Sequence, residues 1–155
     1  MKVFTTRFSP FIAVAAIIVL GFSNCNKSEE EIIEDITPVM SAKIGGKSWT
    51  TKIAAGVNST IYVITGTEDK EAIILTIPTK TVGDYTIDGL NNMASYVQNI
   101  DSISDAYVAY SGEIKLESLN TIRTQVNGTF NFKAVNANLD TISITGGTFK
   151  NIPTK

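Results

Sequence analysis

The sequence predicts an all-β protein, a single antiparallel β-sandwich or small β-barrel of about 8 to 10 strands behind an N-terminal signal peptide and a tether. Short runs rich in β-branched and aromatic residues follow one another after residue 38, separated by Gly, Asn and Asp turn signals. Apolar and polar residues alternate in several runs, as where Ile114 and Leu116 stand between charged neighbours. That alternation is typical of a sheet with one face on a core and one face in water. We find no convincing helical period after residue 38.

The amino-acid composition excludes several classes of function. A chain of 155 residues is long enough for one domain with its own core. The net charge of −2 gives no basic surface, so nucleic acid is not expected as a partner. The absence of His and the single Cys exclude the common zinc sites, Ser–His–Asp triads and Cys–His dyads. We therefore expect a protein that is not an enzyme and has no cofactor and no metal.

Residues 1–24 have the pattern of an export signal. Lys2 and Arg7 precede the apolar run 11–20, which is too short to cross a hydrocarbon core of ~30 Å as a helix. Its length suits the apolar region of a signal peptide. Cys25, the only cysteine, follows where an exported lipoprotein carries its acylated residue.

This arrangement resembles bacterial lipoprotein precursors, and more closely those of the Bacteroidota, whose lipobox is loose. Phe22 and Asn24 depart from the usual Leu at −3 and Gly or Ala at −1. The resemblance implies a diacylglyceryl thioether on Cys25, cleavage before it, and attachment to the outer membrane through the acyl chains. Residues 26–31 are similar to the Lys-then-acidic signal for surface exposure, with a Ser between the Lys and the acids. Secretion after cleavage at Ser23 and a retained membrane anchor are the alternatives.

Residues 25–37 are expected to carry the lipid and form an acidic tether. Five acidic residues lie in a stretch without Gly or aromatic residues, which favours a solvated spacer. A short helix is the alternative, because Ile32, Ile33 and Ile36 recur at helical spacing. The β domain then spans residues 38–155.

The β domain divides into short runs with sensible turns between them. The predicted strands are Val39–Ile44, Ser48–Ala55, Thr60–Thr65, Glu71–Pro78, Gly83–Ile87, Met93–Gln98, Ala106–Ser111, Glu113–Leu119, Thr121–Ala134 and Thr141–Phe149. Three consecutive apolar residues, 73–75, favour a central strand covered on both faces.

A second resemblance concerns the C-terminal half. Residues 127–132, NGTFNF, and 144–149, ITGGTF, look like the paired endings of small Bacteroidota lipoprotein domains of unknown function. The opening 45–49, GGKSW, and the central 83–85, GDY, fit the same picture. The resemblance implies a β domain behind a lipid anchor and supplies no activity and no site residue.

Carboxylates are the remaining candidates for chemistry. Residues 101–105 place oxygens at alternate positions, as calcium loops do, but lack the Gly and the distal Glu, so we interpret them as a solvated loop. Asp84 with Asp88, and Glu113 with Glu117, are spaced to share one face of a strand. Carboxylate pairs ~5 to 9 Å apart serve glycoside hydrolysis, although surface charges on strands give the same spacing.

Aromatic residues offer a ligand platform if several face outward. The candidates are Trp49, Tyr62, Tyr85, Tyr96, Tyr107 and Tyr110. Tyr107 and Tyr110 are three residues apart and are expected on opposite faces. Trp49, beside a Gly pair, is predicted to plug one end of the core, and core or rim positions are expected for the others.

These observations favour a lipid-anchored cell-envelope protein whose β domain has a binding or structural role, with a protein or a glycan as partner. One alternative is a carrier of an apolar ligand inside a closed barrel, which requires a cavity in place of a solid core. A carboxylate-based glycan hydrolase is the third, and it requires an Asp/Glu pair at the floor of a cleft.

Overall fold

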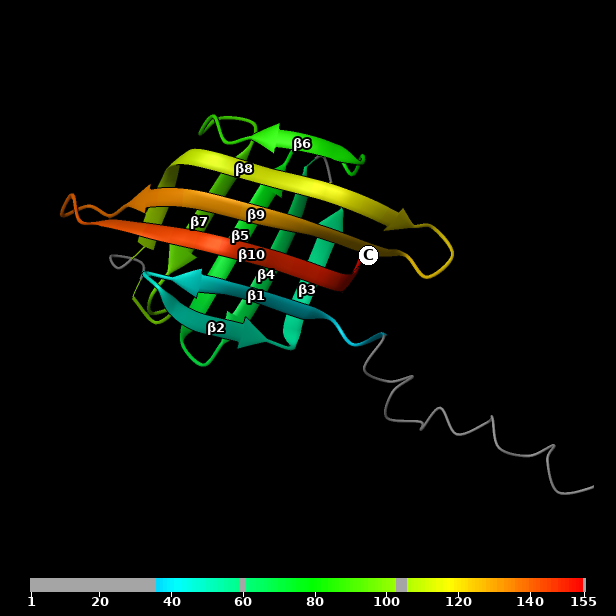
Figure 1. The fold of residues 1–155 in the computed structure, drawn as a ribbon, viewed down its shortest axis with the longest axis horizontal. Helices are drawn as coiled ribbons and strands as arrows, with labels where there is room; N and C mark the ends of the chain where they lie inside the picture. Colours follow the sequence, from blue (N-terminus) through cyan, green and yellow to red (C-terminus); the bar gives the residue numbers. More distant parts are fainter. Residues whose placement is uncertain (1–35, 59–60, 103–105, 155) are drawn as a thin grey trace, which may run out of the picture. The chain divides into compact units, whose positions relative to one another are not determined.

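Ten antiparallel strands form one continuous sheet in the computed structural model, which describes residues 36–58, 61–102 and 106–154 (Figure 1). The strands are β1 (Val39–Ile44), β2 (Lys47–Thr51), β3 (Ile53–Asn58), β4 (Tyr62–Glu68), β5 (Glu71–Ile77), β6 (Gly83–Thr86), β7 (Met93–Val97), β8 (Ala106–Asn120), β9 (Gln125–Val135) and β10 (Thr141–Pro153). Their order is β2-β1-β10-β9-β8-β7-β5-β4-β3, and β6 pairs with β8. The predicted all-β class is confirmed.

The sheet folds over on itself into two layers that nearly close a barrel. Strands β6, β8, β9, β10, β1 and β2 form the front layer in Figure 1, and β7, β5, β4 and β3 cross behind them. A bridge between Gly56 of β3 and Thr154, just after β10, joins the far edge of the back layer to the front layer. The fold therefore lies between the sandwich and the barrel that the sequence predicts.

Gly112 forms one corner of this arrangement. The predicted strands Ala106–Ser111 and Glu113–Leu119 are a single strand, β8, whose first part pairs with β7 and whose second part pairs with β6. Gly112 has φ of 144°, and a Cβ there would lie 2.2 Å from the carbonyl oxygen of Asn131. Only glycine fits, because a side chain would collide with β9 and L residues rarely adopt this φ. The strand bends at this position from one layer into the other.

A second corner follows Thr51, where the predicted strand Ser48–Ala55 is wrong. The chain leaves β2 in the front layer and begins β3 in the back layer. Thr51 is buried, and its Oγ1 accepts the N–H of Ile53 at 2.8 Å and donates to the carbonyl of Thr67. The hydroxyl thus satisfies backbone groups that the ladder loses at the bend.

Other differences from the predicted strands are smaller. β9 starts at Gln125, because Asn120 Oδ1 accepts the N–H groups of Ile122 (3.1 Å) and Arg123 (2.9 Å) and turns the chain first. β10 runs to Pro153 and β4 to Glu68, each beyond the predicted end.

The three apolar residues 73–75 lie on β5, which is central in the back layer between β4 and β7. Ile73 and Leu75 are fully buried, whereas Ile74 is only half-buried. The predicted central position of this strand is confirmed. The prediction that both of its faces are covered is not, because Ile74 on the outer face is partly exposed.

Two reciprocal Gly–Phe pairs hold β9 against β10. Gly128 is opposite Phe149, and Gly147 is opposite Phe130. A Cβ on Gly128 would lie 2.4 Å from the Phe149 ring, and one on Gly147 would lie 2.5 Å from the Phe130 ring. Each ring therefore covers the glycine of the other strand, an arrangement that offsets the weak packing of glycine in a sheet.

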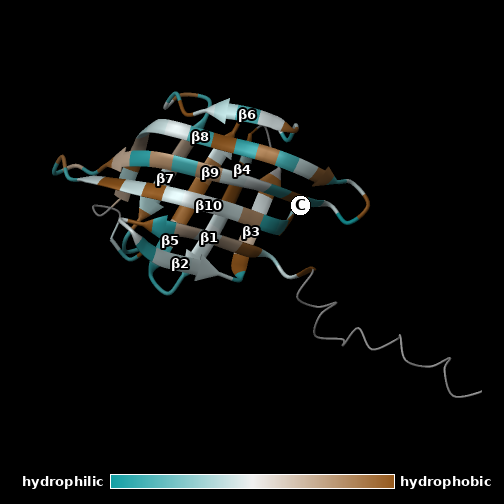
Figure 2. Cartoon of the chain, viewed as in Figure 1, coloured by the Kyte–Doolittle hydropathy of each residue, from teal (hydrophilic) through white to brown (hydrophobic). Residues whose placement is uncertain are grey.

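The alternation predicted for residues 113–117 is present. Ile114 and Leu116 are fully buried, and the charged residues beside them are exposed. Figure 2 shows the resulting alternation of hydrophobic and hydrophilic residues along β8.

Side chains of one apolar cluster fill the space between the layers. Its most buried large members are Tyr62, Phe149, Met40, Ile64, Ile73, Leu75, Ile77, Ile114, Leu116, Ile144, Ile152 and Val126. Within the described residues, no helix has the length and apolar character to cross a membrane. The predicted signal peptide, Cys25 and nearly all of the predicted tether lie outside the described residues.

Candidate functional site

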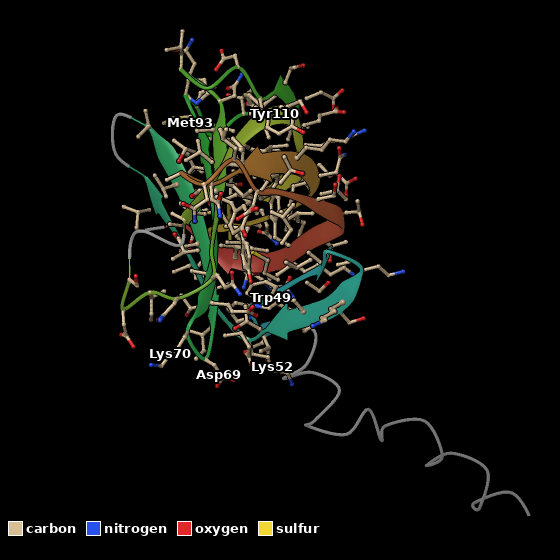
Figure 3. All side chains as sticks on the ribbon, turned by 90° about the vertical axis from the view of Figure 1, so that its left-hand side faces the viewer. Trp49, Lys52, Asp69, Lys70, Met93 and Tyr110 are labelled. Atoms are coloured by element: carbon tan, nitrogen blue, oxygen red, sulfur yellow. The ribbon has the colours of Figure 1, made fainter. Side chains whose placement is uncertain are left out.

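A pocket of about 400 Å³ opens at one end of the β domain, where several strands begin or end. It is lined by Ile44, Gly45, Lys47, Ser48, Trp49, Glu71, Tyr96, Gln98, Tyr107 and Ile142. These residues come from the end of β1, the turn after it and the first half of β2, from the starts of β5, β8 and β10, and from the end of β7 with the residue that follows it. Figure 3 faces this side of the domain and shows Trp49 between the strands of the two layers.

Tyr96 and Glu71 form the polar wall of the pocket. Tyr96 is buried, and its hydroxyl donates a hydrogen bond of 2.5 Å to Oε1 of Glu71. Burial, and then the hydrogen bond and the charge of Glu71, raise the pKa of Tyr96 above its ordinary value, so the phenol stays protonated. Within the described part of the chain, Oε2 of Glu71 has no hydrogen-bond partner and remains available as an acceptor.

Trp49 supplies a buried donor without an acceptor. The side chain is only 6% exposed and packs in the core cluster, in agreement with the predicted plug at one end of the core. It also lines the pocket, and its Nε1 is buried with no hydrogen-bond partner in the structure. The nitrogen is closed off from solvent, so this donor stays unpaired at a cost of ~1–3 kcal/mol.

The structure brings together three of the six predicted aromatic candidates. The ring centroids of Tyr96 and Tyr107 lie 6.0 Å apart, and Trp49 lines the same pocket. Tyr110 lies on the outer face of β8 and is 56% exposed, so the predicted opposition of Tyr107 and Tyr110 holds. Tyr85 donates to the carbonyl of Thr81 at 2.5 Å, away from the pocket.

Asp84 and Asp88, the first predicted carboxylate pair, each have a partner of their own. Asp88 accepts the backbone N–H groups of Leu90, Asn91 and Asn92 at 2.8 to 3.0 Å. These bonds lower the pKa of Asp88 to about 2, so it is an ionised cap of a turn. Asp84 lies 3.7 Å from Nζ of Lys115.

The other two predicted carboxylate features are on the surface. Glu113 and Glu117 are exposed along the outside of β8. Asp101 forms an ion pair of 2.7 Å with Lys70, and residues 103–105 of that loop lie outside the described residues. Across the ranges that the structure describes, no cluster of three or more His, Cys, Asp or Glu is placed to hold a metal ion.

Tyr62, the first residue of β4, is a second buried polar side chain without a hydrogen-bond partner. Its hydroxyl is buried and makes no hydrogen bond, and burial raises the pKa of Tyr62 above its ordinary value. Tyr62→Phe should therefore raise the free energy of unfolding at neutral pH by about 1 kcal/mol. Urea unfolding measures this, and Tyr110→Phe, at an exposed position, should change it by no more than ~0.5 kcal/mol.

Tyr62→Phe should also change how the free energy of unfolding depends on pH above ~10. The unfolded chain releases the Tyr62 proton near pH 10, before the folded chain does, so the native state loses stability as pH rises above ~10, by about 1.4 kcal/mol per pH unit. Tyr62→Phe should remove this contribution. If the variant kept the same slope of stability against pH above ~10, or lost stability at neutral pH, the Tyr62 hydroxyl would not be a buried group without a hydrogen bond.

Residues 36–153 match a family described as a domain of unknown function, DUF6252. Searches of curated proteins and of solved structures gave no match. The family match covers more than half of the chain and includes every residue of the pocket. The chain therefore belongs to the DUF6252 family.

Proposed function

We propose that the protein is a lipid-anchored component of the cell envelope whose β domain binds a small polar ligand in the pocket beside Trp49, without catalysing a reaction. The observation that carries the binding role is the hydrogen-bonded pair of Tyr96 and Glu71 in the wall of an open pocket, where Oε2 of Glu71 stays available as an acceptor. A pocket of about 400 Å³ lies within the range of ~300–1,000 Å³ that is usual for small-molecule sites.

Two structural features argue against the alternative functions. Large apolar side chains of the core cluster fill the space between the layers, where an apolar cargo would have to lie. The pocket lining contains one carboxylate, Glu71, whereas glycoside hydrolysis requires two. A binding role needs neither an internal cavity nor a second carboxylate.

The sequence supports the anchor. Cys25 is the only cysteine and directly follows the predicted signal peptide, and an unpaired cysteine in an exported protein calls for an explanation such as acylation. The twelve residues 26–37 span ~40 Å when extended at ~3.3 Å per residue, which separates the β domain from the lipid surface. Their acidic side chains are repelled by anionic headgroups.

Intact-mass analysis of the protein purified from its native membrane tests the anchor. The expected result is a chain that begins at Cys25 and is heavier by a diacylglyceryl group, whereas the Cys25→Ala variant should carry no lipid and partition to the aqueous phase. A wild-type chain that begins at Asn24 without lipid would overturn the anchor.

The binding role has its own test. Trp49 is the only tryptophan, so its indole N–H gives a single resonance in a ¹H–¹⁵N correlation spectrum. A library of small polar fragments should contain members that shift this resonance. A library that leaves it unmoved would overturn the binding role and would leave the anchor unaffected.

A further inference from the structure

We infer that the pocket recognises a neutral sugar or polyol ring, an inference that rests on the proposed binding role of the same pocket. The lining combines aromatic surface with hydrogen-bonding groups of both kinds. Three aromatic rings, one carboxylate, one amide and one ammonium surround the opening, contributed by Trp49, Tyr96, Tyr107, Glu71, Gln98 and Lys47.

The unpaired polar atoms select a ligand that both donates and accepts. Nζ of Lys47 can only donate, and Oε2 of the Glu71 carboxylate can only accept. A hydroxyl group satisfies either atom, and a ring with adjacent hydroxyls satisfies both at once. An ammonium ligand would bring a second positive charge towards Lys47, and a carboxylate ligand would bring a second negative charge towards Glu71.

The charge and the aromatic surface of the pocket lining also favour a neutral sugar ring. One cation, Lys47, and one anion, Glu71, line the pocket, so the lining has no net charge to attract an ionic ligand. Tyr107 is half-buried and lies at a tilted angle to Tyr96, which leaves an aromatic surface beside the opening. The C–H face of a sugar ring is apolar and packs on such a surface, while its hydroxyls reach the polar wall.

The test uses the full-length protein in a detergent whose headgroup is not a sugar. The probes are D-glucose, D-galactose and N-acetyl-D-glucosamine, with choline and acetate as ionic comparators. Both the indole resonance and the fluorescence of Trp49 report binding, because the chain has one tryptophan. We expect at least one of the three sugars to shift both signals in a saturable manner, and neither ionic comparator to do so.

Substitutions in the pocket lining test whether the sugar binds there. Glu71→Gln should weaken sugar binding about tenfold, because a hydrogen bond to a charged acceptor is lost. Glu113→Gln makes the same chemical change on the outside of β8 and should have no effect. Gln98→Ala, at an exposed position of the rim, should weaken binding about threefold. It provides the test if Glu71→Gln does not fold.

Each other outcome overturns a distinct statement. Shifts with choline or acetate and none with the three sugars would overturn the sugar assignment and leave the binding role intact. Equal weakening by Glu71→Gln and Glu113→Gln would place the sugar elsewhere and overturn the assignment. No response to the sugars or to the fragment library would overturn the binding role as well.

Discussion

Gly128→Ala is expected to unfold the β domain. A Cβ at this position would lie 2.0 Å from the carbonyl oxygen of Lys115 and 2.4 Å from the ring of Phe149. The first obstacle is backbone of the neighbouring strand β8, so no rotamer change relieves it. Over-packing usually costs ~1–3 kcal/mol, and separating two central strands should cost more, against a total stability of ~5–15 kcal/mol.

Circular dichroism and urea unfolding measure this effect. Gly146→Ala is the matched control on β10, since no atom lies within 4 Å of its Cβ position. It carries only the strain of its φ of 58°, ~1–2 kcal/mol. A Gly128→Ala protein that unfolds at the same urea concentration as the control would show that the strands move apart cheaply, contrary to our expectation.

Phe130→Ala is expected to lower the free energy of unfolding by about 3–5 kcal/mol. Phe130 is 2% exposed, and its ring centroid lies 6.2 Å from that of Phe132 and 6.4 Å from that of Phe149. The substitution removes these ring contacts, opens a cavity and uncovers Gly147, whose Cβ position lies against the Phe130 ring.

Urea unfolding again gives the free energy, provided that the slope with urea concentration is unchanged. Asn131→Ala, at the next and exposed position of β9, should alter stability by no more than ~0.5 kcal/mol. A loss of less than ~1 kcal/mol for Phe130→Ala would mean that the core refills the space and that the stacked rings contribute little.

The sequence allows most of the strands to be predicted, because alternation and turn residues are local signals. Val39–Ile44 is predicted at both ends, and β5, β6 and β7 differ from prediction by one residue at the C-terminal end. The two corners are not predicted. The break at Lys52 is absent from the local pattern. The prediction ends one strand at Ser111 and begins another at Glu113, whereas the strand continues through Gly112 with a bend.

The candidate site depends on information that the sequence pattern does not contain. Trp49 was predicted at one end of the core, where it lies. Glu71 carries no signal of its own, because its contact with Tyr96 spans 25 positions of the chain and follows from the pairing of β5 with β7. Only the order of strands in the sheet brings the two residues together.

The paired NGTFNF and ITGGTF motifs have a structural explanation. Their glycines and phenylalanines form the reciprocal pairs of β9 and β10, in which Gly128 meets Phe149 and Gly147 meets Phe130. The motifs therefore maintain the centre of the front layer, and they contribute no residue to the lining of the pocket beside Trp49.

The pairing of β1 with β10 determines the order in which this protein can fold. The first strand of the domain bonds along the last, and the hydroxyls of Ser41 and Thr148 meet at 2.9 Å although 107 positions separate them. Such distant contacts make folding slow, on the order of milliseconds to seconds. Until the thirteen residues of β10 have been synthesised, β1 and β9 both lack their common neighbour. The sheet therefore cannot close until β10 has been synthesised, and the strands made before it must wait without their central partner.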